Sequence, residues 1–465
     1  MPLIIPSNSI SAGGFVIDNS LRFDGSSDYL NRTFGTATNR LKLTISVWLK
    51  KSDLTTGLFF TSYNSGSFRF QFYFDGSDRL GLLNVDSGTN NVELITNRVF
   101  RDLSAFYNLQ AVIDTTQSTA SDRVKIYVNG VQETSFSTAT YPSQNADMSL
   151  GAGSYSCQLG RYGGGSDYFS GYMSEVIYLD GQTLDPTSFG EFDEDTGIWK
   201  PIDVSGLTFG NEGFYLDFEN SGSLGADVSG NGNNFTVNNL TSIDQTTDTP
   251  TNNFATLNRL NFPTSNAPTF SDGNLTTTTG AGNFGGTSTL GASQGKYYAE
   301  FKFVTNNSGG MFVGITADPS EDARNNRYVG QSSLSYSYIQ DGQKYNNSSG
   351  SAYGDSFTTG DIIGVAIDLD NDALYFSKNG TFQNSGDPTS GATKTGAISI
   401  TSGYDYFFSL SDGSNPDTSV YSCNFGSPPY SISSGNSDGA GFGQFEYAPP
   451  SGYLALCTKN LATDG

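Results

Sequence analysis

The chain has 465 residues, and its 46 acidic and 23 basic side chains give a formal net charge of −23. It contains no histidine. The lack of histidine excludes Ser-His and Cys-His nucleophilic catalysis as well as histidine-ligated zinc. The negative charge repels phosphate backbones, so we expect no nucleic-acid partner.

Aromatic and turn-forming residues dominate the composition, with 34 Phe, 26 Tyr and 56 Gly. Aromatic side chains fit strands better than helices, and glycine permits tight turns, so the composition favours an all-β fold. Cys157, Cys423 and Cys457 are too few and too scattered for a disulfide framework or a Cys-rich metal site. We expect them to be reduced and buried.

The sequence shows no membrane-spanning run and no secretory signal. Residues 1–6 lack a basic start, and no apolar run approaches the length of a membrane span. We therefore expect synthesis in a cytosol and no membrane insertion. Residues 1–18 are apolar and interrupted by proline, which predicts an extended arm or an edge strand.

Alternating strands begin at Ser20. Residues 41–49 place five apolar side chains on one face: Leu41, Leu43, Ile45, Val47 and Leu49. Residues 20–25, 68–76, 123–131 and 172–181 are further strands that end in or contain Asp-Gly or Asn-Gly turns.

This order of motifs resembles the laminin-G-like, concanavalin A-like jelly roll. The resemblance rests on Leu21–Gly25, Val47–Leu49, Tyr127–Gly130 and Gly171–Val176. The following segments, Phe189–Pro201, Gly213–Phe218, Asp227–Phe235 and Asp248–Leu257, resemble a connector found in proteins of tailed bacteriophages. We assign residues 19–260 to this first module with its connector.

Residues 261–288 are rich in Thr, Ser, Gly and Asn, which indicates a linker or weak strands at the start of a second module. In that module, Gly360–Asp370 and Ala373–Gly380 resemble the signature hairpin of SPRY domains. We assign residues 289–426 to a SPRY sandwich and 427–465 to a C-terminal tail with a last strand near Tyr453. The predicted fold class is thus all-β, with two tandem antiparallel β-sandwiches.

The jelly-roll resemblance raises the possibility of glycoside hydrolysis, which needs two carboxylates that face one bond. The nearest match to a Glu-x-Asp-x-x-Glu pattern is Glu191, Asp193 and Glu194, where Thr196 replaces the last glutamate. Flanking glycines indicate a solvated acidic turn instead. We expect no catalytic residues and no enzyme activity.

Asp and Asn cluster in several loops, and calcium is the candidate ion for them. The first choice is the loop with Asp227, Asn231 and Asn233. The alternative is simple turn chemistry, because Asx side chains bond their own backbone. No other cofactor is expected.

Tyrosines in loops are candidate ligand-binding residues, because their rings can stack on sugars or on a protein partner. SPRY domains, by resemblance, bind through loops at one end of the sandwich, here residues 321–356. The alternative is that many of these tyrosines only pack over strands. The candidates are Tyr162, Tyr168, Tyr328, Tyr336, Tyr338, Tyr345 and Tyr353.

The combined resemblance implies a structural protein of a tailed-phage virion, made in the host bacterial cytoplasm: a tail fibre, an appendage or a capsid-decorating protein. Its partners would be other virion proteins, and it would form a homo-oligomer. The alternative is an adhesin for a host-surface receptor or glycan. A carbohydrate-active enzyme is the third hypothesis.

Overall fold

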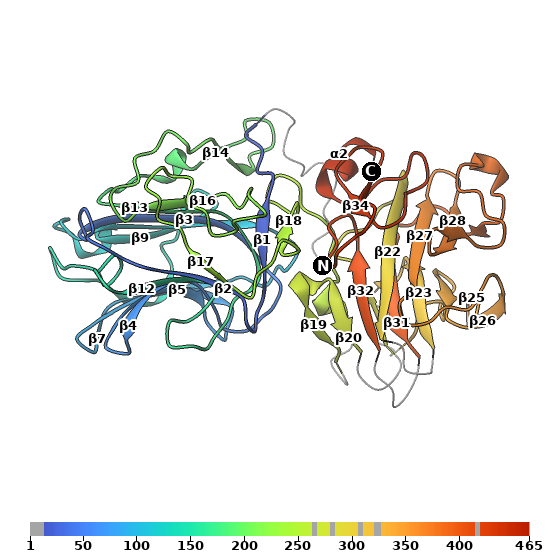
Figure 1. Cartoon of the computed structure of the whole chain (residues 1–465), viewed down its shortest axis with the longest axis horizontal. Coiled ribbons are helices and arrows are strands. Elements are labelled where there is room, and N and C mark those ends of the chain that lie inside the picture. The colour runs from blue at the N-terminus through green and yellow to red at the C-terminus, as the bar shows by residue number, and fades with distance from the viewer. Residues whose placement is uncertain are drawn as a thin grey trace. The chain divides into compact units, whose positions relative to one another are not determined.

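The computed structural model describes residues 14–262, 267–279, 284–305, 310–319, 327–413 and 419–464. Its chain forms two compact units that meet in sequence between Thr251 and Asn252. We call them the N-terminal and the C-terminal unit (Figure 1). Each is a pair of antiparallel sheets, so the predicted all-β fold with two tandem sandwiches is confirmed. The predicted arm, residues 1–18, lies mostly outside the described residues.

Two sheets form the N-terminal unit, and in Figure 1 β3 and β13 lie on one side of it and β4, β5 and β12 on the other. Sheet A has the order β10 (Val131–Gln132), β9 (Val124–Val128), β8 (Tyr107–Asp114), β3 (Lys42–Lys51), β13 (Ser170–Asp180), β1 (Ser20–Asp24) and β18 (Gln245–Thr246), with β16 (Phe214–Leu216) paired to β13. Sheet B has the order β11 (Phe136–Thr140), β7 (Thr89–Val99), β6 (Arg79–Asp86), β5 (Phe68–Phe74), β4 (Gly57–Ser65), β12 (Ser156–Leu159), β2 (Tyr29–Thr33) and β17 (Thr236–Asn238).

The core of this unit lies between the two sheets. The predicted alternation of β3 holds, because Leu43, Ile45 and Val47 are buried in one cluster. Sheet B contributes Phe70 and Phe72 to the same cluster.

All three cysteines of the chain are buried and unpaired, as predicted.

The outer face of sheet A, which points away from sheet B, is covered by the connector, residues 184–251. Trp199, in the small ribbon of β14 (Gly190–Phe192) and β15 (Trp199–Pro201), clusters with Trp48 and Ile17. Asp248, near the connector's end, forms an ion pair of 2.5 Å with Lys50, and both side chains are at most 2% exposed. Apolar and charged side chains on the outer face of sheet A are therefore buried by a segment without long strands.

Glu175 lies beneath this connector. A bulge between Ser174 and Ile177 interrupts the register of β13 with β3 and leaves Glu175 at a φ of 50°. The hydroxyl of Tyr215 donates a hydrogen bond of 2.5 Å to the Glu175 carboxylate. Burial raises the pKa of Glu175 to about 8, although the bond from Tyr215 acts in the opposite direction.

Replacing Glu175 with glutamine should change how stability depends on pH. With a pKa raised to about 8 in the folded state and near 4.5 otherwise, Glu175 takes up a proton on folding across this interval. The free energy of unfolding of the wild type should therefore fall as pH rises, by up to roughly 1.4 kcal/mol per pH unit. Glutamine does not titrate, so its free energy of unfolding lacks this decrease. The stability of Glu175→Gln relative to the wild type should therefore rise between about pH 5 and about pH 8.

Urea denaturation followed by tryptophan fluorescence measures this difference. The chain has two tryptophans, Trp48 and Trp199, and both lie in the N-terminal unit, so the signal reports that unit. If the difference in free energy of unfolding between Glu175→Gln and the wild type does not change with pH, Glu175 is ionised in the folded chain.

The C-terminal unit is a second sandwich. Sheet C has the order β19 (Thr269–Ser271), β20 (Thr276–Thr278), β32 (Val420–Asn424), β22 (Lys296–Thr305), β27 (Ile362–Asp368), β28 (Ala373–Lys378) and β29 (Thr381–Phe382), with β30 (Ile398–Ser399) paired to β28. Sheet D has the order β21 (Phe284–Thr287), β31 (Phe407–Asp412), β23 (Met311–Thr316), β24 (Ser335–Ile339), β25 (Gln343–Asn346) and β26 (Ser349–Ala352).

The predicted linker needs a correction. Within residues 261–288, β19 and β20 extend sheet C and β21 is an edge strand of sheet D. The described part of this segment is therefore not a linker. The second reading of its sequence holds, because short threonine-rich strands pair readily at a sheet edge even without a strong apolar pattern.

The predicted tail belongs to the same sandwich. Residues 427–464 cover the outer face of sheet C, where Phe445 and Tyr453 pack with Tyr298. The tail holds the short strands β33 (Asn436–Ser437) and β34 (Gln444–Phe445) and the helix α2 (Thr458–Asp464). Near Tyr453, where a last strand was predicted, isolated bridges such as Tyr297 with Leu454 occur instead.

Glu300 on β22 holds this tail. Its fully buried carboxylate accepts hydrogen bonds from the backbone N–H groups of Tyr447 at 2.8 Å and Glu446 at 3.0 Å. The side-chain amide of Asn424 donates a third bond of 3.2 Å. Burial raises the pKa of Glu300 to about 7, and these hydrogen bonds partly offset the effect.

Removing this carboxylate should loosen the tail. In Glu300→Ala the N–H groups of Glu446 and Tyr447 lose their acceptor, and a buried group left without a partner costs about 1–3 kcal/mol. Hydrogen exchange read by mass spectrometry should become faster across residues 444–448. Glu219→Ala, at an exposed position of the N-terminal unit, is the control. Unchanged exchange at residues 444–448 would contradict the role of Glu300.

Candidate functional site

The predicted calcium loop is a hydrogen-bonded turn. The Asp227 carboxylate accepts bonds from the backbone N–H groups of Tyr215, Ser229 and Asn233 and from the Ser229 hydroxyl. The side-chain amide of Asn231 donates to the carbonyls of residues 210 and 213. The side-chain oxygen of Asn233 accepts a bond of 2.6 Å from the Arg32 guanidinium.

This arrangement does not suit a cation. The oxygens of Asp227 already have donors, and Asn233 faces a positive charge, so the three residues do not converge on an open position. Across the described ranges no group of three or more His, Cys, Asp or Glu residues could hold a metal ion. The turn chemistry set out above as the alternative accounts for these contacts.

Calcium should therefore leave the stability of the chain unchanged. We expect the same melting temperature with calcium at about 5 mM, above the dissociation constants of weak extracellular calcium sites, and with a chelator. Differential scanning calorimetry measures this, with magnesium as the control cation. A rise in melting temperature specific to calcium, abolished in Asp227→Asn, would restore the calcium hypothesis.

The candidate carboxylates of the β14–β15 ribbon share one lysine. Lys200 Nζ lies 3.3 Å from an oxygen of Glu191 and 3.3 Å from an oxygen of Asp193. Asp193 also accepts bonds from the backbone and hydroxyl of Thr196, while Glu194 is exposed. Glu191 and Asp193 are therefore structural partners of Lys200. The predicted solvated turn holds only for Glu194, because Glu191 lies on β14 and Asp193 is buried.

Three of the predicted ligand-binding tyrosines lie in the core. Tyr336, Tyr338 and Tyr353 are 5%, 0% and 6% exposed, so the prediction that they are exposed is wrong. Alternation along β24 turns Tyr336 and Tyr338 toward the inside of the sandwich. There the Tyr338 ring contacts those of Tyr353 and Phe376.

Tyr328 and Tyr345 lie on the opposite, outer face of sheet D and are partly buried. The ring of Tyr328 stacks on Phe312 with centroids 4.6 Å apart, and Tyr345 meets Phe312 edge-on at 5.8 Å. Val329 and Ile339 complete this group. We call these five residues the sheet D aromatic surface. It lies beside β26, whose four residues are all exposed at the sheet edge.

Tyr162 and Tyr168 belong to a second group, in the N-terminal unit. Tyr162 meets Tyr63 edge-on at 5.4 Å, and Tyr168 meets Tyr29 at 6.4 Å. The guanidinium of Arg161 lies 3.7 Å from the centroid of the Tyr29 ring. All five side chains are partly exposed. We call them the Arg161 patch; sequence reasoning missed Arg161, Tyr29 and Tyr63.

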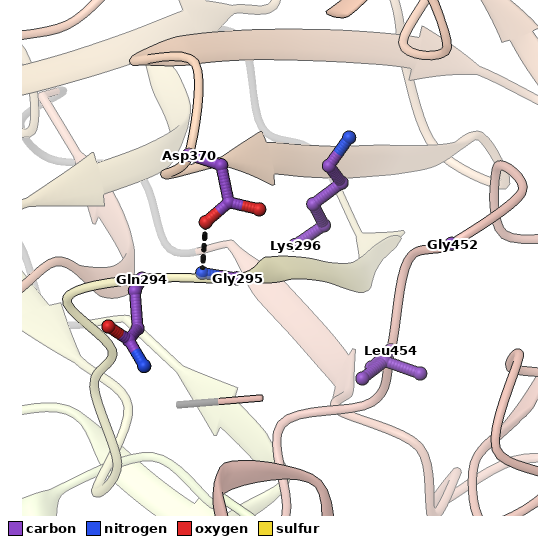
Figure 2. Close-up of a pocket in the computed structure, with 6 residues that line it drawn as sticks. All are labelled: Gln294, Gly295, Lys296, Asp370, Gly452 and Leu454. Carbon is purple, nitrogen blue, oxygen red and sulfur yellow. Dashed lines mark hydrogen bonds between the residues drawn. The ribbon is translucent and has the colours of Figure 1, made fainter. Parts of the chain in front are cut away.

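A pocket of about 350 Å³ lies in the C-terminal unit, where β22 begins. Figure 2 shows Asp370 pointing toward Gly295, whose N–H donates a bond of 2.8 Å to it. Lys296 in the pocket wall forms an ion pair of 3.1 Å with the buried Asp368. Lys296 is thus paired within the fold and Asp370 is bonded to the backbone, so neither is placed as an acid–base pair for a ligand.

No helix among the described residues is long and apolar enough to cross a membrane.

Comparison with known families gives two matches. The profile of the concanavalin A-like lectin/glucanase superfamily matches residues 24–182, and that of the SPRY domain matches residues 296–401. The chain contains both domains. The first lies within the N-terminal unit and the second within the C-terminal unit.

Curated relatives match a short part of the chain. The Ran-binding proteins 9/10 homolog of Drosophila melanogaster is 37% identical over 92 residues, which is 19% of this chain and 9% of that protein. Human Ran-binding protein 9 is 38% identical over 92 residues, or 12% of its length. The dual specificity protein kinase splA of Dictyostelium discoideum is 37% identical over 82 residues, 17% of this chain and 3% of that kinase. The chain thus spans only a small fraction of these relatives.

Among solved structures, the SPRY domain of human HERC1 is 21% identical, with a TM-score of 0.25, and the match covers 32% of this chain and 87% of that one. A pentraxin from Limulus polyphemus is 17% identical, with a TM-score of 0.29, and the match covers 37% and 80% of the two chains.

These comparisons correct the predicted function and location. The SPRY and laminin-G-like resemblances hold, but the curated relatives are eukaryotic cellular proteins and not components of a phage particle. The predictions of a virion location, of a tail-fibre or capsid-decorating role, and of virion or host-glycan partners are therefore wrong. The connector motifs behind them are short and rich in turn residues, and such motifs arise in many β proteins. The homo-oligomer stays a prediction.

Proposed function

We propose that this chain is a non-enzymatic protein-interaction protein whose C-terminal unit binds a protein segment on the outer side of sheet D. The observation that carries the proposal is the identity of 37–38% over 92 residues with Ran-binding proteins, whose name describes binding to another protein. The proposed partner is a peptide segment of another protein.

The sheet D aromatic surface supplies suitable contacts. Tyr328 and Tyr345 are large, partly exposed and fixed by their packing on Phe312, so they lose little freedom when a partner binds. Gly350 of β26 brings the hairpin backbone close to Tyr345, because a Cβ at this position would lie 2.6 Å from the ring. Buried aromatic anchors of this kind dominate the affinity of many interfaces.

The neighbouring edge strand supplies a second mode of contact. β26 pairs with β25 on one side, and its exposed residues form the free edge of sheet D. An extended peptide can add to such an edge through backbone hydrogen bonds while its side chains meet the adjacent surface. The residues of β26 are Ser, Gly, Ser and Ala, which leave the edge sterically open.

The titratable groups also favour binding over catalysis. Glu175 and Glu300 have the raised pKa values that an acid catalyst needs, but the connector and the tail cover them. Glu191 and Asp193 are paired with Lys200. The chain has no histidine to act as a base near neutral pH.

Substitution of Tyr345 tests the proposal. A yeast-displayed library of random peptides, selected on the full chain, should yield peptides that bind the wild type and bind Tyr345→Ser at least about tenfold more weakly, a loss of about 1.4 kcal/mol. Tyr404→Ser is the matched control, because Tyr404 is 43% exposed in the same unit but outside the aromatic surface. Fluorescence anisotropy with the selected peptides measures the affinities.

Two outcomes would overturn the proposal. One is that repeated selections enrich no peptide, and the other is that all enriched peptides bind Tyr345→Ser and the wild type equally. Matching melting temperatures of the three proteins confirm that a loss of binding does not come from unfolding.

A further inference from the structure

Arg161, in the N-terminal unit, is held in one orientation by four contacts. Its backbone carbonyl accepts a bond of 3.1 Å from the Thr61 hydroxyl, and its Nε donates a bond of 3.0 Å to Gln158. Its guanidinium lies over the ring of Tyr29 at 3.7 Å and near that of Tyr168 at 5.8 Å. The plane of the guanidinium is thus set before any ligand arrives.

The loop that carries Arg161 is equally constrained. Tyr162 and Ser166 are joined by a backbone bond of 3.1 Å, and the N–H of Phe169 donates to the carbonyl of residue 160 at 2.9 Å. Gly163 lies beneath Tyr63, where a Cβ would stand 2.1 Å from the Cβ of that tyrosine. Tyr162 and Tyr168 therefore belong to a defined turn, and they meet Tyr63 of β4 and Tyr29 of β2.

Arg161 has no carboxylate partner among the described residues, in contrast to four arginines that hold one closely. Arg32, Arg79, Arg98 and Arg101 each form an ion pair of 3.0 Å or less with a carboxylate. Arg161 forms none with the described residues, and its Nη atoms have no hydrogen-bond acceptor among them. The guanidinium of Arg161 is thus fixed by its rings and by Gln158, partly exposed, and open at its Nη edge.

The surroundings add one more positive charge. Arg69, which pairs with Tyr63 across β4 and β5, exerts a Coulombic effect on Tyr162 and likewise has no ion pair with the described residues. The acid of the loop is Asp167, which is exposed and accepts a bond of 3.2 Å from the Ser166 hydroxyl. The patch is thus a local site of positive charge framed by tyrosines.

We propose that the Arg161 patch binds an acidic segment of a protein partner, with an Asp or Glu carboxylate on the open Nη edge of Arg161. A guanidinium matches a carboxylate with two parallel hydrogen bonds, and its fixed plane reduces the entropy lost on binding. Tyrosine and arginine together are typical of the residues that dominate protein interfaces.

Fluorescein-labelled octaglutamate is the probe, with octaglutamine as the neutral comparison, and fluorescence anisotropy on the full chain gives the affinity. About 150 mM salt screens the long-range repulsion from the acidic chain while a direct ion pair persists. We expect octaglutamate to bind and octaglutamine not to. Arg161→Gln should weaken octaglutamate binding at least about tenfold, and Arg161→Lys, which keeps the charge but loses the planar fork, should weaken it severalfold.

Arg98→Gln is the matched control. Arg98 lies over the ring of Phe100 at 5.2 Å with 45% of its side chain exposed, but Glu133 already occupies its guanidinium. This variant has the same net charge as Arg161→Gln and should bind octaglutamate like the wild type. Tyr345→Ser should do so too, which separates this test from that of the proposed function.

The proposal is overturned if octaglutamate does not bind, or if Arg161→Gln binds like the wild type while its melting temperature is unchanged. An equal loss in Arg98→Gln would reveal a mere effect of net charge. Displacement of octaglutamate by inorganic triphosphate at an equal concentration of charge would indicate a general anion site and would also overturn it. If Arg161→Gln is unfolded, Arg161→Lys decides the question.

Discussion

Both sandwiches depend on the burial of an outer sheet face, which carries apolar and charged side chains, beneath a segment that is itself mostly irregular. In the N-terminal unit Lys50 and Asp248 join sheet A to the connector, and in the C-terminal unit Glu300 joins β22 to the tail. Charged groups in such positions are costly to bury, and removing one partner leaves the other uncompensated. These contacts therefore fix the position of each covering segment, and their net contribution to the free energy of unfolding is small.

This coverage determines which surfaces are available for binding. The outer faces of sheets A and C are covered around Glu175 and Glu300, and the raised pKa values of these two carboxyls are consequences of that burial. The aromatic groups on the remaining sheets, B and D, are open enough to meet a partner. A shifted pKa in a cleft can indicate catalysis, but here both shifted carboxyls serve the attachment of a covering segment.

Period-two alternation predicted the β-sandwiches well, because Leu43, Ile45 and Val47 need only their own strand to indicate a common face. Residues 321–356 were assigned to loops, but β24, β25 and β26 lie within this range, so the rule was not applied to Tyr336 and Tyr338 and both were misassigned. Arg161 and Tyr29 were missed because they meet only through the pairing of β12 with β2. The role of Asp227 could not be predicted for a different reason. Calcium-binding loops and Asx turns are both rich in Asp and Asn, so composition does not distinguish them.

The first and last described segments of the C-terminal unit lie side by side. Residues 253 and 458 exchange two hydrogen bonds of 2.9 and 3.0 Å, and the N–H of Ala255 donates to the carbonyl of Leu456 at 2.9 Å. A domain whose two ends emerge at one place can be inserted into a surface loop of another protein without stretching either chain. The C-terminal unit therefore has a geometry that suits insertion into another protein, domain shuffling and circular permutation.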